Sequence, residues 1–403
     1  MNNANSEQSR RRFLGQISKA GLLGMAGLKA PAILPPPEQV QPAASHTFSC
    51  KPYLQYPAPG SISINWLTAR PCYSWVEYGT NGQLNLKAHH VINGLVDANS
   101  RFHRVRLDNL EPGQTYQYKV LSKDILSFEP YKLTYGETIE SPVYSFTAIN
   151  PQAKEVSWLI LNDIHDRPAS IPHLINLNGK DPYDFVFLNG DMFDYQSGEQ
   201  QIIDHLLNPC GDTFSTRQPF MYVRGNHETR GKYARQWHDY FDNPYYFSFQ
   251  VGPVAAIVLD TGEDKEDNTP VYAGIVDFDN YRQQQAVWLE QQLQSKAFRK
   301  ARYKVVMMHI PHYHSGDWHG VMHCRQLFGP LFNKHKIDIL ICGHTHKYGI
   351  HEPVKGEHDY PLIIGGGPQE GKRTLIKIKA DQQQFKLEML RDDGVKVGEY
   401  TLR

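Results

Sequence analysis

The chain has 403 residues, of which 42 are basic and 42 acidic, so its formal net charge at neutral pH is zero. This balance argues against binding of the whole chain to nucleic acid or to an anionic membrane, because both require an excess of positive charge. The length exceeds what one hydrophobic core usually serves, so we expect two domains and a terminal tail. Five cysteines are too few for a disulfide scaffold, although Cys50 and Cys72 could pair in an oxidising compartment.

The N-terminal segment has the features of an export signal. Arginines occupy positions 10–12 ahead of Phe13-Leu14, and an apolar stretch broken by glycine, lysine and proline follows over residues 17–34. This pattern resembles a bacterial twin-arginine signal, with a frayed amphipathic helix as the alternative. No uninterrupted apolar run reaches the about 18–20 residues of a stable membrane anchor. We therefore predict a signal peptide and Pro-rich spacer over residues 1–45, recognition by the twin-arginine export machinery, and a periplasmic or extracellular location.

Residues 46–150 carry short alternating runs separated by turn signals, the pattern of a β-sandwich of about 100 residues. Five runs put apolar side chains on one face, namely residues 61–66, 74–78, 102–107, 115–120 and 143–147. In the segment from Leu107 to Tyr118, a Pro-Gly turn precedes Tyr-x-Tyr. These features are similar to the fibronectin III or Ig-like domain that precedes the catalytic domain in purple acid phosphatases. We expect a packing and spacing module, with a wall beside the active site as the alternative.

Residues 151–403 alternate strand-like and helix-like patterns, which predicts a layered α/β domain. Two helical stripes, in residues 197–207 and 283–294, are expected to face the core. Their apolar members are Ile202, Ile203, Leu206, Leu207, Val287, Trp288, Leu289 and Leu293. Residues 361–364 and 374–379 are expected to be closing strands of a second sheet. For the intervening Gly365-Gly366-Gly367 we favour a tight turn over a phosphate cradle.

Five apolar runs in this region end in side chains that can bind a metal ion. Such runs are typical of buried parallel strands, and ligands of open α/β sheets bind outside the carboxyl ends of the strands. We therefore expect the five endings to converge on one site. Its candidate ligands supply carboxylate and amide oxygens and imidazole nitrogens, and they are Asp163, His165, Asp191, Asn226, His309, His344 and His346.

Seven donors are too many for one catalytic ion with an open position, but they suit two ions about 3.5–4 Å apart that share a carboxylate. Asp191, which follows the apolar run 185–189, is the natural bridge. His344 and His346 are two residues apart, so their side chains can point the same way. Gly343 is expected to let the backbone turn sharply toward the ions.

The ordered series D-x-H, G-D-x-x-D, G-N-H-E, H and G-H-x-H resembles that of the calcineurin-like metallophosphoesterase superfamily. The resemblance implies a four-layer α/β/β/α catalytic domain over residues 151–403 and two divalent or trivalent metal ions, of Zn, Fe or Mn. It also implies a division of the ligands. One ion would be held by Asp163, His165, Asp191 and His346, and the other by Asp191, Asn226, His309 and His344.

The resemblance further implies hydrolysis of a small phosphate monoester, in which a hydroxide bridging the metal ions attacks phosphorus in line. His227 would hydrogen bond the phosphate or donate a proton to the leaving oxygen. One alternative is a phosphodiesterase acting on nucleotide or lipid-headgroup diesters. Another is a cell-surface binding protein with a vestigial metal site, against which the seven intact ligand positions argue.

The resemblance to purple acid phosphatases is partial. Those enzymes have tyrosine at the end of G-D-x-x-Y and glycine at the end of D-x-G, where this chain has Asp194 and His165. Because Tyr195 follows one residue too late, we expect neither a tyrosinate-to-iron charge-transfer colour nor an acidic optimum. Asp194 is predicted to orient a metal ligand, with a buried turn-forming aspartate as the alternative.

A histidine-rich segment follows the candidate ligand His309. It is similar to the H-x-P-x-Y segment of the family and contains His312, Tyr313 and His314. We expect these three side chains to edge the substrate pocket, and the alternative is a loop on the solvated surface.

Overall fold

The structure, a computed structural model, describes residues 45–403. The predicted export signal and the Pro-rich spacer fall outside the described residues. Among the helices of residues 45–403, none combines the length and the hydropathy needed to cross a membrane. All five cysteines lie in the described part of the chain and are buried free thiols, so Cys50 and Cys72 are not paired.

The N-terminal part is all β. Its strands are β1 (Tyr53–Ala58), β2 (Ser61–Gly79), β3 (Leu86–Ala88), β4 (Val91–Ile92), β5 (Leu95–Val96), β6 (Ala98–Leu107), β7 (Thr115–Glu129), β8 (Lys132–Glu140) and β9 (Tyr144–Thr147). The long strand β2 pairs antiparallel with β1, β3, β6 and β7. Alternate residues such as Trp66, Val105 and Tyr118 form its buried core. The expected β-rich N-terminal domain is therefore present.

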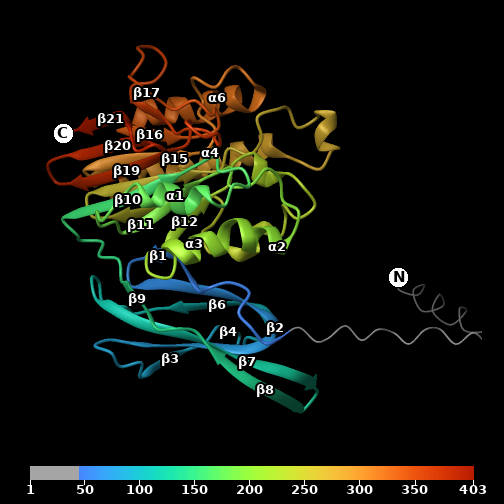
Figure 1. The fold of residues 1–403 in the computed structure, drawn as a ribbon. Coiled ribbons are helices and arrows are strands. Elements are labelled where there is room, and N and C mark those ends of the chain that lie inside the picture. The colour runs from blue at the N-terminus through green and yellow to red at the C-terminus, as the bar shows by residue number, and fades with distance from the viewer. Residues whose placement is uncertain (1–44) are drawn as a thin grey trace, which may run out of the picture. The chain divides into compact units, whose positions relative to one another are not determined.

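Two sheets form the centre of residues 151–403 (Figure 1). The first contains, in spatial order, β21 (Lys396–Leu402), β20 (Phe385–Arg391), β19 (Thr374–Asp381), β10 (Glu155–Leu161), β11 (Phe185–Asn189) and β12 (Phe220–Val223). The second contains β13 (Phe247–Val251), β14 (Val254–Leu259), β15 (Tyr303–Met308), β16 (Ile339–Cys342), β18 (Leu362–Ile364) and β17 (Gly349–His351). Strands β10, β11 and β12 are parallel, as are β14, β15 and β16. Their carboxyl ends therefore share one edge.

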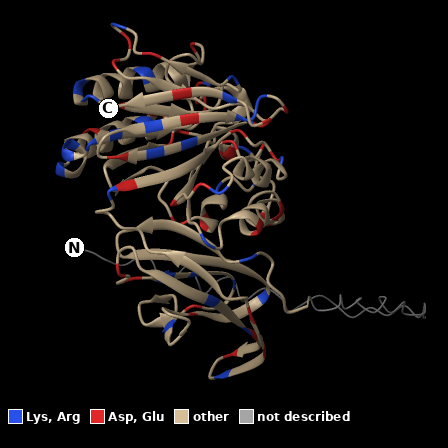
Figure 2. Cartoon of the chain, turned by 60° about the vertical axis from the view of Figure 1, so that its left-hand side comes forward, with Lys and Arg blue, Asp and Glu red and all other residues tan. Residues whose placement is uncertain are grey.

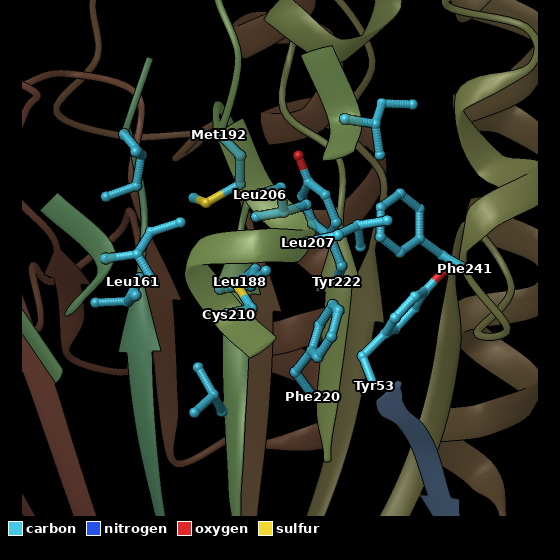
Figure 3. Packing of buried hydrophobic residues seen from close by; sticks show 14 of the residues in the cluster. Tyr53, Leu161, Leu188, Met192, Leu206, Leu207, Cys210, Phe220, Tyr222 and Phe241 are labelled. Carbon is cyan, nitrogen blue, oxygen red and sulfur yellow. The ribbon is translucent and has the colours of Figure 1, made fainter. Parts of the chain in front are cut away.

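Helices cover the outer faces of both sheets. Against the first sheet pack α1 (Ser170–Asn176), α2 (Glu199–Ile202), the π-helical turn η1 (Ile203–Leu207) and α3 (Asn208–Thr213). Figure 3 shows Leu206 and Leu207 of η1 and Cys210 of α3 beside Leu188 and Tyr222 of the sheet. Against the second pack α4 (Phe278–Gln294), α5 (Lys296–Lys300) and α6 (His319–His335). Short 3₁₀ turns are η2 (His227–Thr229), η3 (Trp237–Tyr240) and η4 (Pro270–Tyr272). A third apolar cluster fills the space between the sheets, which completes the expected α/β/β/α layers.

The two predicted helical stripes have different outcomes. Ile202, Ile203, Leu206 and Leu207 are all buried, as expected. In the second stripe Leu289 and Leu293 are buried, but Val287 is 63% exposed, so its expected core position is wrong. The reason is that α4 buries the face that carries Arg282, Gln285, Leu289 and Leu293. Two of these residues are polar, and hydrophobicity alone did not identify that face.

The two late strands do not close the same sheet. Strand β18 lies in the second sheet beside β16, as expected. Strand β19 instead pairs antiparallel with β10 in the first sheet, so its predicted place is wrong. Both segments place apolar side chains on a buried face of their sheet. Their hydrophobic patterns do not indicate which strand of which sheet they pair with.

The β-rich domain is joined to the first sheet. Strand β1 pairs parallel with β12, with Gln55 opposite Phe220. Two buried tyrosines add hydrogen bonds: Tyr53 Oη donates to the carbonyl of Tyr240 at 2.9 Å, and Tyr118 Oη to that of Thr216 at 2.9 Å. These contacts hold the β-rich domain against the first sheet. Figure 2 shows basic and acidic residues interspersed over the described chain, in keeping with its balanced charge.

Candidate metal centre

The structure brings the seven predicted ligands together. Asp163, His165, Asp191 and His346 place one ligand atom each within 4.8 Å of one another, and so do Asp191, His309 and His344. The amide oxygen of Asn226 lies 3.0 Å from His344 Nδ1, which adds this residue to the second group. We refer to these seven residues as the dinuclear site. Asp191 is the member common to both groups.

One oxygen of Asp191 lies between the two groups. Its Oδ2 is 3.0 Å from His309 Nε2 and 3.6 Å from His165 Nε2. Its other oxygen accepts a hydrogen bond from the backbone N–H of His227 at 2.9 Å. The carboxylate is therefore held by the backbone on one side and presents its free oxygen to both groups, which is the placement that a bridging ligand requires.

Several donor atoms of the site require a cation. Asp163 Oδ1 and His309 Nε2 are buried without a hydrogen-bond partner in the described chain. His165 Nε2 and His346 Nε2 face each other at 3.0 Å. Leaving Asp163 Oδ1 and His309 Nε2 unpaired in the protein interior costs about 1–3 kcal/mol each. Metal ions would satisfy all of these atoms, so the residues fit two cations held by mixed oxygen and nitrogen donors.

The pKa values of the site histidines also show that the buried carboxylates favour positive charge beside them. Burial alone would lower the pKa of His165, but the neighbouring carboxylates of Asp163 and Asp191 raise it to about 9. Burial is likewise overcome at His309, where the charges of Asp191 and Asp163 raise the pKa to about 10. In the metal-free chain, protons on these two imidazoles thus balance the two carboxylates. Metal ions compete with those protons.

The backbone around the site is strained. Five of the seven residues have left-handed φ values, which are 53° at Asp163, 50° at His165, 54° at Asp191, 73° at His344 and 57° at His346. Such conformations cost about 1–3 kcal/mol each for non-glycine residues and concentrate at functional sites. Backbone hydrogen bonds from Asp163 N to Gly190 O and from His165 N to Asp191 O, both 3.0 Å long, hold the loops in place.

Gly343 serves a different purpose from the one predicted. The residues His344 and His346 themselves have the left-handed conformation, whereas Gly343 does not. A Cβ atom at Gly343 would lie 2.5 Å from Asp163 Oδ2. Glycine is therefore required because the carboxylate passes close to the backbone. The same reason applies at Gly225, where a Cβ would lie 2.2 Å from Asp191 Oδ1.

The three glycines at 365–367 also provide close packing, so the predicted tight turn is wrong. They follow β18 without a turn assignment, and none has a positive φ. A Cβ would lie 1.9 Å from Asn162 Oδ1 at Gly365 and 2.4 Å from His346 Cβ at Gly367. Gly365 N donates to Cys342 O and Gly366 N to Thr374 Oγ1. These two N–H groups are thus not free to bind a phosphate.

Glu228 is a positioning residue to which sequence reasoning assigned no role. It is fully buried, and it accepts hydrogen bonds from the N–H groups of Asp191, Met192 and Gly225 at 2.9, 2.7 and 2.6 Å. Tyr222 Oη donates to the same carboxylate at 2.7 Å. Glu228 therefore ties the loop after β11 to the loop after β12. Its place as the last letter of G-N-H-E is the only signal in the sequence.

His227 lies beside the dinuclear site together with an arginine that the sequence did not single out. His227 Nδ1 donates to the carbonyl of Asp194 at 2.8 Å, and Nε2 accepts from Arg230 Nη1 at 3.1 Å. Glu263 holds Arg230 through two hydrogen bonds, of 2.7 and 2.9 Å. Burial, aided by the charges of Arg230 and His165, lowers the pKa of His227. The pair thus offers a neutral imidazole and a fixed guanidinium.

Asp194 has the contact expected of a carboxylate that orients a ligand. Its Oδ1 lies 2.8 Å from His165 Nδ1, which turns His165 Nε2 toward Asp163 and Asp191. The side chain of Asp194 is 48% exposed, so the alternative of a buried aspartate is wrong. Tyr195 is 58% exposed and belongs to neither ligand group.

The histidine-rich segment after His309 contributes no member to either ligand group. His312 is fully buried, and its Nε2 contacts Tyr360 Oη at 2.7 Å, so neither the pocket edge nor the solvated surface describes it. Tyr313 Oη donates to the carbonyl of Glu357 at 3.2 Å. His314 is exposed and stacks on His351 with ring centroids 3.8 Å apart.

Two protein families match the chain, each over a different range of residues. Residues 157–348 match the Calcineurin-like phosphoesterase family, and residues 50–148 match the family described as Purple acid Phosphatase, N-terminal domain. Acid phosphatase type 7 of Mus musculus is 26% identical over 339 residues, covering 76% of this chain and 70% of the relative. The Homo sapiens protein of the same name is 27% identical over 353 residues, covering 78% and 75%.

Two solved structures share the fold. Purple acid phosphatase PPD1 from yellow lupin superposes with a TM-score of 0.66 at 18% identity, covering 87% of this chain and 73% of its own. The structure of PhoD superposes with a TM-score of 0.63 at 12% identity, covering 89% of each chain.

The class of protein follows from the layered fold, the paired ligand groups and these matches. The chain is a metal-dependent phosphoester hydrolase. More particularly, residues 157–348 form a calcineurin-like phosphoesterase domain with a binuclear metal site, and a purple acid phosphatase N-terminal domain precedes it.

Proposed function

We propose that the chain hydrolyses phosphate monoesters at the dinuclear site. The observation that carries this proposal is that Asp191 lies between two ligand groups while His227 and Arg230 stand beside them. The relatives named acid phosphatase and purple acid phosphatase support it. The two ions would be Zn, Fe or Mn, because the donors combine carboxylate, amide and imidazole.

We assign the ligands in two groups. Asp163, His165, Asp191 and His346 hold one ion, and Asp191, Asn226, His309 and His344 hold the other. The support for this division is geometric, since the side chains meet in these groups and only Asp191 is placed in both.

The chain's own residues bind the substrate and handle the leaving-group proton. When bound, the two metal ions supply Lewis acidity and an activated water for in-line attack. Arg230, held by Glu263, presents its guanidinium to the phosphate oxygens. Once Arg230 bonds the phosphate, His227 Nε2 is free to take up a proton from solvent, and the charge of Asp191 favours the resulting imidazolium. Nε2 then gives this proton to the leaving oxygen, while Nδ1 keeps its hydrogen bond to the carbonyl of Asp194.

A monoester suits this arrangement better than a diester. Its dianionic phosphoryl group offers more acceptor oxygens to the guanidinium and the metal ions than the monoanionic group of a diester does. The test compares purified enzyme on an aryl phosphate monoester and a bis-aryl phosphodiester, after metal analysis without added metal. Preference for the monoester with two ions per chain is expected. A preference for the diester, or no hydrolysis by the fully loaded chain, would contradict the proposal.

We also propose that the protein is exported after folding. The support is the Arg10-Arg11 pair ahead of Phe13-Leu14. Replacing both arginines by lysine should leave the phosphatase activity in the cytosolic fraction. Replacing Arg12 alone should leave a smaller share of the activity there. Unchanged periplasmic activity in the double variant would show that another route exports the chain.

A further inference from the structure

A second group of metal-binding side chains lies between two helices of the outer layer. Asp279 is in the first turn of α4, and His319 and His323 are in the first two turns of α6. Their ligand atoms lie within 4.8 Å of one another. None of the three belongs to the dinuclear site. We refer to them as the α4–α6 cluster.

The spacing of the α4–α6 cluster suits one ion. His319 and His323 are four residues apart and project from the same side of α6. His319 Nε2 lies 2.9 Å from both oxygens of Asp279, and His323 Nδ1 lies 3.0 Å from Oδ1. Neighbouring ligands of a tetrahedral zinc ion are about 3.3 Å apart, given zinc–ligand bonds of about 2.0–2.1 Å. Side-chain movements of a few tenths of an ångström would therefore admit an ion.

Hydrogen bonding within the group does not account for all of its atoms. Within residues 45–403, the buried His323 Nδ1 has no hydrogen-bond partner, although it lies close to Asp279 Oδ1. The side chains of Asp279 and His319 are 36% and 35% exposed, so an ion and a completing water can reach them.

The surroundings prepare Asp279 to act as a ligand. Arg282 Nη1 donates to its Oδ1 at 3.0 Å, which leaves Oδ2 for a metal ion. Asp267 fixes the backbone at the start of α4, because its carboxylate accepts from the N–H groups of Phe278 and Asp279 at 3.0 and 2.9 Å.

We propose that Asp279, His319 and His323 bind one divalent cation of the zinc class, separate from the dinuclear site. Two imidazoles, one carboxylate and a water form a donor set that zinc prefers. The ion joins α4 to α6. It also steadies Arg282, which donates to the carbonyls of Thr261 and Glu263, and Glu263 in turn holds Arg230.

Metal stoichiometry tests this proposal. The full chain is saturated with zinc, freed of loosely bound ions by gel filtration, and analysed by elemental mass spectrometry. We expect about three zinc ions per chain, with two in the dinuclear site. The double variant His319→Gln/His323→Gln should retain two, and the control His335→Gln, in the last turn of the same helix, should retain three. Two ions in the unaltered chain, or three in the double variant, would overturn the site.

A second set of variants separates this site from the dinuclear one. Asp191→Asn should lose the dinuclear ions yet keep one zinc ion, and adding His323→Gln should remove it. If Asp191→Asn retains both dinuclear ions, Asp191 is not the bridging ligand. Even then, the loss of one ion on adding His323→Gln to this variant still tests the α4–α6 cluster. Should the double histidine variant not fold, Asp279→Asn replaces it, because the amide oxygen can still accept from Arg282. Retention of the third ion in Asp279→Asn would reject the proposal.

Discussion

The dinuclear site and the α4–α6 cluster use similar side chains in different settings. The dinuclear site stands on loops at strand ends, its buried members include Asp163 and Asp191, and five of its residues have left-handed backbones. The α4–α6 cluster stands on two regular helices at the surface, and none of its residues has a positive φ. Strain and burial therefore accompany the site that performs chemistry. A site that joins two helices needs neither.

The largest expected effect is that of Asp191→Asn on the dinuclear site. The variant removes the charge that both ligand groups share, so both ions should be lost together and hydrolysis should fall to background. Elemental analysis and turnover measure the two outcomes. Asp264→Asn, which alters a carboxylate outside both ligand groups, is the matched control. Two bound ions with near-normal turnover in Asp191→Asn would show that another residue is the bridge.

Changing His227 to alanine should slow turnover while both dinuclear ions remain. His227 is adjacent to Asn226 but belongs to neither ligand group of the assignment. General acid catalysis contributes about 10²–10⁴-fold, and this loss is expected for alkyl phosphates, whose leaving groups need a proton. Nitrophenyl phosphate, which releases a stable anion, should lose little. Equal losses for both substrates, or loss of metal, would instead indicate a structural role.

A smaller effect is expected from Asp194→Asn. Asp194 contacts His165 without belonging to the assigned ligand set. Loss of a carboxylate that orients a metal-binding histidine typically costs about 10–100-fold in metal affinity or activity. Metal titration should show one weakened ion, with the other unchanged. Equal weakening of both ions would mean that Asp194 acts on the shared ligand rather than on His165.

The pH dependence of metal binding sharpens the comparison further. The folded-state pKa values of His165 and His309 are raised to about 9 and about 10. The protonated imidazoles therefore stabilise the metal-free chain, and this contribution is fully present at pH values below 6.5, the ordinary pKa of histidine. It is lost as pH rises through 9 and 10. Loading the dinuclear site at pH 7.5 should therefore release about two protons. The α4–α6 cluster, in which burial lowers the pKa of His323, should release fewer protons.

Calorimetry in two buffers of different ionisation enthalpy measures this release. The double variant His319→Gln/His323→Gln isolates the dinuclear contribution. Absence of proton release from that variant would show that the two imidazoles are already neutral in the metal-free chain.

Much of the dinuclear site could be predicted from the sequence. Each ligand follows a strand-like apolar run or the glycine at its end, and the carboxyl ends of parallel strands meet at one edge of a sheet. Local patterns were thus sufficient for Asp163, Asp191, His309 and their partners to be expected together. The division into ligand groups came from family resemblance, and the described geometry accommodates it.

Other features were decided only by the tertiary structure. The sequence did not indicate that His312 is buried against Tyr360, that β19 joins the first sheet, or that Glu263 reaches Arg230. In each case the partner is distant along the chain, and no periodic pattern encodes which surfaces will meet. The α4–α6 cluster is the clearest example, since the residues 279 and 319 become neighbours only when α4 packs on α6. Strand ends are determined by local hydrophobicity and glycine, whereas contacts between helices depend on how the layers pack.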